Sequence, residues 1–167
     1  MRRSWLFFIL AAHLLIPLAA TGQALEKGRI ADVLPAEGLD KTSVVVFRDQ
    51  ATLNAHYYLA DETVLGLGKK TKAVFARYRT GAGAALLLVV AYPSDEEVRR
   101  VYEKFGQEFF SKTFDAKSPR TLEKLETGDY AAAVLSRSVL IVVLEAPDRK
   151  SCDELARQAE ERALALF

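Results

Sequence analysis

The sequence predicts an α+β domain with a mainly antiparallel sheet and helices packed on one face. Residues 84–92 and 139–144 are apolar throughout and have the length of strands buried on both faces. Each of these runs follows another strand-like segment and precedes an amphipathic helix that opens with a capping pattern. We therefore expect two strand–strand–helix units in tandem, and their matching order suggests an internal duplication.

The first 24 residues have the three parts of a secretory signal peptide. Arg2 and Arg3 supply the positive start, residues 5–20 form the apolar run, and residues 22–24 fit the small-residue cleavage pattern. We expect cleavage after Ala24 and an exported protein, periplasmic or secreted. The alternative is an uncleaved membrane anchor, although the run is short for a bilayer span of about 20 residues.

The mature chain has the length of one domain with a real core. We expect an irregular segment over residues 25–41, which contains Pro35 and Gly38, and a single domain over residues 42–167. Loss of Arg2 and Arg3 with the leader changes the net charge from +1 to −1. A chain so close to neutral has no long-range field to attract nucleic acid or an anionic membrane.

Three candidate strands precede the apolar strand at 84–92 in the first half of the domain. The β-branched run at 43–47 predicts a strand, 50–58 a short helix and 63–67 a further strand. The alternation at 72–80 predicts a longer strand. The glycines within 81–83 favour a hairpin turn into the apolar strand that follows.

The helices are predicted from capping patterns and apolar spacing. Ser94 with Glu97 makes a capping box, and an apolar stripe follows over residues 98–109 of a helix that should end near Phe114. A second pair of strands follows at 130–136 and 139–144. Ser151 with Glu154 then predicts a second capping box, whose helix carries the stripe Cys152, Leu155, Ala156, Ala159, Ala163 and Leu166.

The sequence lacks the patterns of common cofactor and metal sites. Residues 66–71 superficially resemble a phosphate-binding loop, but Thr63 and Lys70 stand where the motif needs glycine and a hydroxyl. We interpret this stretch as a flexible turn. The mature chain offers only His56 and Cys152 as soft metal ligands, so we expect no metal and no cofactor.

Catalytic chemistry is only weakly indicated. His56 could serve as a base, but no G-x-S-x-G elbow presents a serine to it. A pair of carboxylates that hydrolyses glycosides stays an open alternative. Cys152 is the single cysteine, so no intramolecular disulfide can form. It is either reactive at the helix start or, as we favour, buried on the apolar stripe.

One polar and aromatic group could bind a ligand. Asn54, His56, Tyr57 and Tyr58 stand close together in sequence, and Arg77 could join them in the fold. Aromatic rings with a few hydrogen-bonding groups are typical of small-ligand sites. The alternative is that the tyrosines pack under a loop with their hydroxyls at the surface.

Four stretches of the chain are informative together, namely VLPAEGLDKTSVVVF, LNAHYYLADETVLGLG, ARYRTGAGAALLLVVAYPSDEEV and VLIVVLEAPDRKSCDEL. They resemble a family of exported bacterial proteins built on a domain of unknown function. The resemblance runs from about Leu34 onward and matches the C-terminal part of longer members. It implies export, and it transfers no established reaction and no catalytic residue.

These observations favour a non-catalytic binding module of the cell envelope. Its partner would be a protein or a small ligand there, not nucleic acid, and it would meet the membrane only through an uncleaved leader. The alternative is an envelope hydrolase that uses carboxylates or His56. A third possibility is a structural subunit that pairs through an exposed sheet edge.

Overall fold

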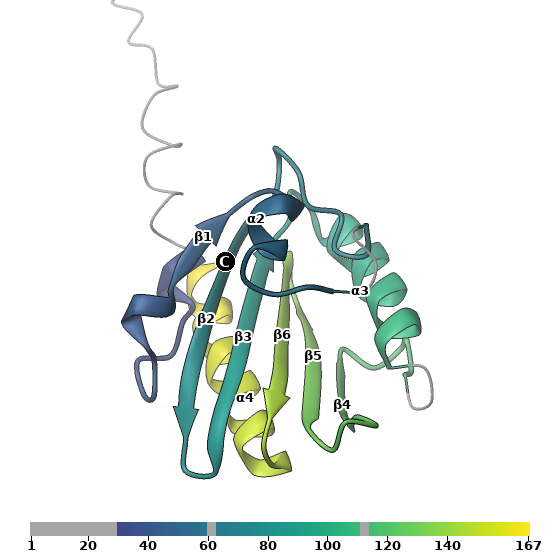
Figure 1. Ribbon diagram of the computed structural model, residues 1–167. Coiled ribbons are helices and arrows are strands. Elements are labelled where there is room, and N and C mark those ends of the chain that lie inside the picture. The colour runs from purple at the N-terminus through teal and green to yellow at the C-terminus, as the bar shows by residue number, and fades with distance from the viewer. Residues whose placement is uncertain (1–29, 60–62, 111–113) are drawn as a thin grey trace, which may run out of the picture.

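The computed structural model describes residues 30–59, 63–110 and 114–167. Six of its strands form one open sheet in the order β1-β2-β3-β6-β5-β4, and all neighbouring strands are antiparallel (Figure 1). The elements in chain order are η1 (Lys41–Ser43), β1 (Val45–Phe47), α2 (Gln50–Asn54), β2 (Lys72–Thr80), β3 (Gly83–Ala91), α3 (Asp95–Phe109), β4 (Arg120–Lys124), β5 (Tyr130–Ser136), β6 (Val139–Ala146) and α4 (Arg149–Leu166). The predicted α+β class and antiparallel sheet are confirmed.

The sheet consists of two three-stranded meanders that meet at its centre. β3 and β6, the last strands of the two meanders, pair with each other, with Leu88 opposite Val142. α3 follows the first meander and α4 follows the second. The tandem order of strand, strand and helix is therefore present, with β4 as an additional edge strand. β4 was not expected from the sequence because it is short and only Thr121 in it is buried.

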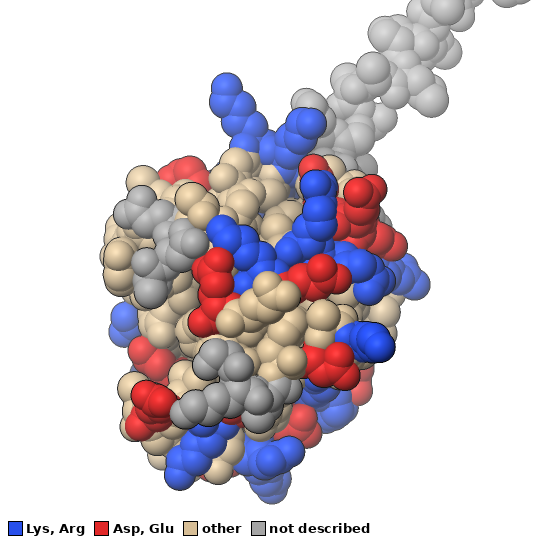
Figure 2. Space-filling model, turned by 90° about the vertical axis from the view of Figure 1, so that its right-hand side faces the viewer, with Lys and Arg blue, Asp and Glu red and all other residues tan. Residues whose placement is uncertain are grey.

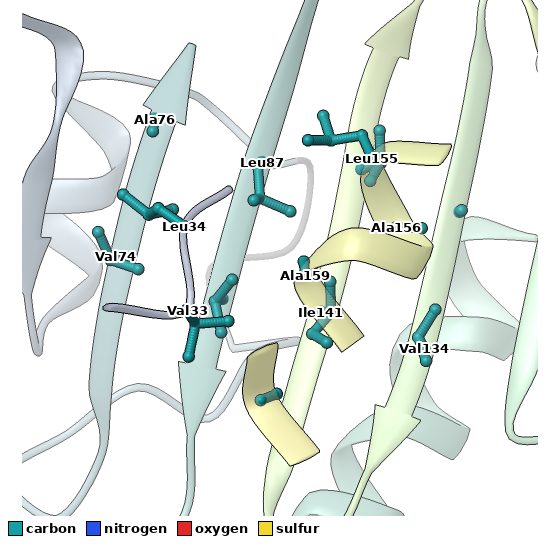
Figure 3. Packing of buried hydrophobic residues seen from close by; sticks show 14 of the residues in the cluster. Val33, Leu34, Val74, Ala76, Leu87, Val134, Ile141, Leu155, Ala156 and Ala159 are labelled. Atoms are coloured by element: carbon teal, nitrogen blue, oxygen red, sulfur yellow. The ribbon is translucent and has the colours of Figure 1, made fainter. Parts of the chain in front are cut away.

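The two long helices lie on opposite faces of the sheet, so the expectation that they share one face is wrong. α3 packs with one apolar cluster and α4 with the other, and the strands contribute alternate residues to each. On β3, for example, Leu87 faces α4 while Leu88 faces α3. Figure 3 shows the α4 side, where Leu155, Ala156 and Ala159 pack with residues that include Val33, Leu34, Val74, Ala76, Leu87, Val134 and Ile141.

A β-bulge near the end of β6 explains why the two helices separate. Leu144 and Glu145 of β6 together oppose the single residue Ala131 of β5, and Glu145 has a φ of 54°. The extra residue reverses the alternation, so Ala146 faces the α4 cluster. On β3, Tyr92 follows the unbroken alternation onto the α3 side. Two units related by rotation within one antiparallel sheet would keep their helices on the same face, so the structure shows no symmetric duplication.

Local structure differs from the sequence prediction in three further places. Residues 63–67 form a turn, not a strand, with Gly66 N–H donating to the Thr63 carbonyl. The short helix ends at Asn54 rather than at residue 58. α4 is capped by Asp148, whose carboxylate accepts from Ser151 N–H at 2.9 Å, and not by a Ser151 capping box.

The predicted cap at Ser94 is confirmed, because its hydroxyl oxygen accepts from Glu97 N–H at 3.2 Å. The segment expected to be irregular contributes Ile30, Val33 and Leu34 to the α4-side cluster. Among the described residues, those of both clusters lie between Ile30 and Leu166, so a chain that begins at Leu25 contains all of them.

Candidate functional site

The residues of the predicted ligand group lie on or just after α2, with Arg77 on β2. Asn54 ends α2, and its side-chain oxygen accepts from Gln50 Nε2 at 2.8 Å. His56 is exposed and Tyr58 is 66% exposed. The group is thus only partly assembled, since one member makes a helix-internal hydrogen bond and two others face outward.

Tyr57 is the one member of this group that packs against the sheet. Its ring centroid lies 6.2 Å from that of Phe75 on β2. Burial, followed by the charge and the hydrogen bond of the Glu145 carboxylate, raises the pKa of Tyr57. Arg77 lies two residues from Phe75 on the same face of β2. Tyr57 therefore packs under the loop, as the alternative interpretation expected. Ligand binding by the whole group stays a prediction.

Cys152 takes the buried position that we favoured. It lies in the α4-side cluster with no exposed surface. Burial, assisted by the neighbouring charge of Asp153, raises the pKa of this thiol to about 12. The thiol is therefore protonated at neutral pH and has the role of a small apolar side chain.

In the part of the chain that the structure describes, no three His, Cys, Asp or Glu side chains are grouped so that they could hold a metal ion. No helix among the same residues is both long enough and apolar enough to cross a bilayer.

A basic cleft of about 460 Å³ lies between the loop at 63–71 and the first half of α3. We name it the basic cleft. Lys69 and Lys70 line it from the loop, and Arg100 and Lys104 line it from α3. Successive turns of a helix bring residues i and i+4 to one face, which places the two α3 cations side by side. Glu97 is the only carboxylate among the described residues that line it.

Hydrogen bonds hold the loop wall of the basic cleft in place. The buried Tyr92 hydroxyl, just after β3, donates to the Leu65 carbonyl at 2.7 Å. The Thr71 hydroxyl accepts from Gly68 N–H and donates to the Gly68 carbonyl, both at 2.9 Å. Lys104 Nζ donates to the Thr63 hydroxyl at 2.8 Å, which joins α3 to the loop. The expected turn is present at residues 68–70, and these hydrogen bonds tie the loop around it to Tyr92 and to α3.

The charges in the basic cleft are incompletely neutralised. Lys104 approaches Glu108 at 3.8 Å. Among the described residues, by contrast, no carboxylate forms an ion pair with Lys69, Lys70 or Arg100. Cations that converge on one hollow repel one another, and an anion placed between them would relieve that repulsion.

Sequence reasoning did not find the basic cleft because its two walls are about 30 residues apart. The loop fails the phosphate-loop motif, and its lysines are typical of a solvated loop. Arg100 and Lys104 belong to no binding motif that the sequence shows. The spacing of those two cations on α3 was a signal, but nothing in the sequence says that loop 63–71 lies against that face.

Comparisons with protein-family models, with curated proteins and with solved structures find no match to this chain. The resemblance to an exported bacterial family therefore stays a prediction.

Proposed function

We propose that this protein is an exported, non-catalytic binding module of the cell envelope that holds an anionic ligand in the basic cleft. The supporting observation is that Lys69, Lys70 and Arg100 converge on one hollow, where no described carboxylate pairs with them. Export is taken from the leader sequence, and the ligand class from the charge of the cleft. A ligand that carries phosphate or carboxylate groups matches this charge.

The dimensions and the build of the basic cleft support binding of a small group. Its volume of about 460 Å³ falls in the range of small-ligand sites, roughly 300–1,000 Å³. Hydrogen bonds between a cation and an oxyanion are about twice as strong as neutral ones. Because Tyr92 and Thr71 already fix the loop, little ordering of the backbone would oppose binding.

The experiment is titration calorimetry of the chain from Leu25 to Phe167 with inorganic pyrophosphate and citrate as probes. We expect saturable binding that weakens as salt is added, since the attraction is between charges. Lys69→Gln combined with Arg100→Gln should weaken it at least about tenfold. The matched control is Lys41→Gln combined with Arg149→Gln, two exposed cations outside the basic cleft.

Equal affinity in the two double variants would refute the assignment of the site, and no binding of either probe would refute the ligand class. The hydrolase alternative has its own test, which is loss of a hydrolytic activity in His56→Ala. Nothing among the described residues favours that alternative, since His56 is exposed on the segment after α2.

A further inference from the structure

We infer that the anion is the headgroup of an anionic lipid, and that the domain docks on a bilayer through the end of the sheet that carries the basic cleft. This inference rests on the proposed function and names the source of its ligand. Three observations carry it, namely the charge around that end, the apolar side chains exposed within it, and the place where the chain enters the domain.

Two further hollows adjoin the basic cleft at this end of the sheet. One of about 300 Å³ shares Lys70, Tyr92 and Pro93 with it, and one of about 400 Å³ shares Ile30 and Lys72 with the second. We name the three together the basic end.

Among the residues that the structure describes, six cations and two carboxylates line the basic end. The cations are Arg48, Lys69, Lys70, Lys72, Arg100 and Lys104, and the carboxylates are Asp49 and Glu97. Asp95 and Glu96, in the first turn of α3, are exposed nearby but do not line the hollows. Figure 2, which faces the α3 side, shows Lys and Arg side chains gathered at the top and centre of the view, with Asp and Glu beside them.

Exposed apolar side chains lie among these cations. Val46, on β1, is 53% exposed and lines the hollow that contains Arg48 and Lys72. Phe167, at the C-terminus, is 37% exposed and lines the hollow that contains Lys70. Such a surface suits the boundary between the headgroups and the acyl chains of a bilayer. There the cations would bind lipid phosphates and the apolar side chains would leave water.

The chain also enters the domain at the basic end. Ile30, the first residue that the structure describes, lines two of the three hollows. The apolar run at 5–20 precedes it by only nine residues, which can span at most about 30 Å when fully extended. If the leader is retained, it holds the basic end close to the membrane. If it is cleaved, the cations and apolar groups still present a membrane-binding surface.

The test is flotation of the chain from Leu25 to Phe167 with vesicles of phosphatidylcholine alone or with about a third phosphatidylglycerol. We expect binding to the anionic vesicles only, and its loss when NaCl rises from about 0.05 M to 0.5 M. Each basic residue at a membrane surface contributes about fivefold in partitioning. Lys69→Gln combined with Lys70→Gln should therefore weaken binding about 25-fold, whereas Lys41→Gln with Arg149→Gln should leave it unchanged.

A further variant examines the apolar contribution. Val46→Ser should weaken binding to anionic vesicles several-fold without changing pyrophosphate binding, because Val46 lies outside the basic cleft.

The outcomes separate this inference from the proposed function. Pyrophosphate binding without vesicle binding would refute the lipid inference and leave the anion site standing. Absence of both pyrophosphate binding and vesicle binding would refute the proposed function and the lipid inference together. Equal binding to neutral vesicles, or equal losses in the two double variants, would show that the basic end is not the docking surface.

Discussion

Tyr92→Phe tests whether one hydrogen bond holds the loop wall of the basic cleft. The Tyr92 hydroxyl donates to the Leu65 carbonyl at 2.7 Å, and Tyr92 is only 7% exposed. Phenylalanine keeps the ring but leaves the buried carbonyl without this donor, which costs about 1–3 kcal/mol of unfolding free energy. For a domain of this size, that loss corresponds to a melting temperature lower by roughly 3–9 °C.

Tyr78→Phe is the matched control. Its hydroxyl donates to the Pro35 carbonyl at 3.0 Å, and Tyr78 is 2% exposed on the α4 side of the sheet. Both variants should therefore lose similar stability in thermal unfolding followed by circular dichroism. Calorimetry with pyrophosphate should then show weaker binding only for Tyr92→Phe, because the Tyr92 hydroxyl contacts the loop at 63–71 and the Tyr78 hydroxyl does not.

Two results would refute this reasoning. If Tyr92→Phe has the same melting temperature as the wild type, the hydrogen bond contributes no stability and does not fix the loop. If both variants lose pyrophosphate affinity to the same extent, the effect comes from general destabilisation and not from the wall of the basic cleft.

Three further predictions concern the rest of the fold. Gly38→Ala should lower the unfolding free energy, measured in urea denaturation, by about 2 kcal/mol or more. Gly38 has a φ of +73°, and a Cβ there would stand 2.3 Å from the Arg79 carbonyl oxygen. A variant as stable as the wild type would contradict this reasoning. Cys152 should resist iodoacetamide at pH 8 in the folded protein and react in urea, since burial raises its pKa to about 12; rapid native labelling would contradict its burial. Hydrogen bonds from Ser151 lower the pKa of Asp148 below 3.8. The Asp148 carboxylate therefore stabilises the folded state above that pH, and this contribution is lost as the pH falls through the lowered pKa. The unfolding free energy of Asp148→Asn should fall less steeply in acid, and an unchanged pH profile would exclude the contribution.

The sequence by itself determined the two long helices, the class of the fold and the described strands other than β4. The apolar strands β3 and β6 were recognisable because side chains buried on both faces leave no polar alternation. The helices α3 and α4 were recognisable because their buried side chains recur with the helical period. These are local patterns, so they can be found without knowledge of the remaining chain.

Only the tertiary structure decided the face on which each helix lies. The sequence gives no sign of this, since Leu88 and Val142 both face the α3 side and each stands five residues before a proline. The bulge at Glu145 then reverses the alternation of β6, so that Ala146 faces the α4 side. Sequence periodicity cannot place a bulge, because the partner strand decides which residue is left unpaired.

The basic end was likewise decided by the tertiary structure. A net charge of +1 describes the whole chain and carries no information about where its charges gather. Arg48, Lys70 and Arg100 come from separate segments, and the antiparallel pairing of the sheet brings these segments to one end. Composition therefore argued against an anionic partner, whereas the fold gathers cations on one surface. The two differ because electrostatic attraction depends on the distance between nearby charges and not on the total charge of the chain.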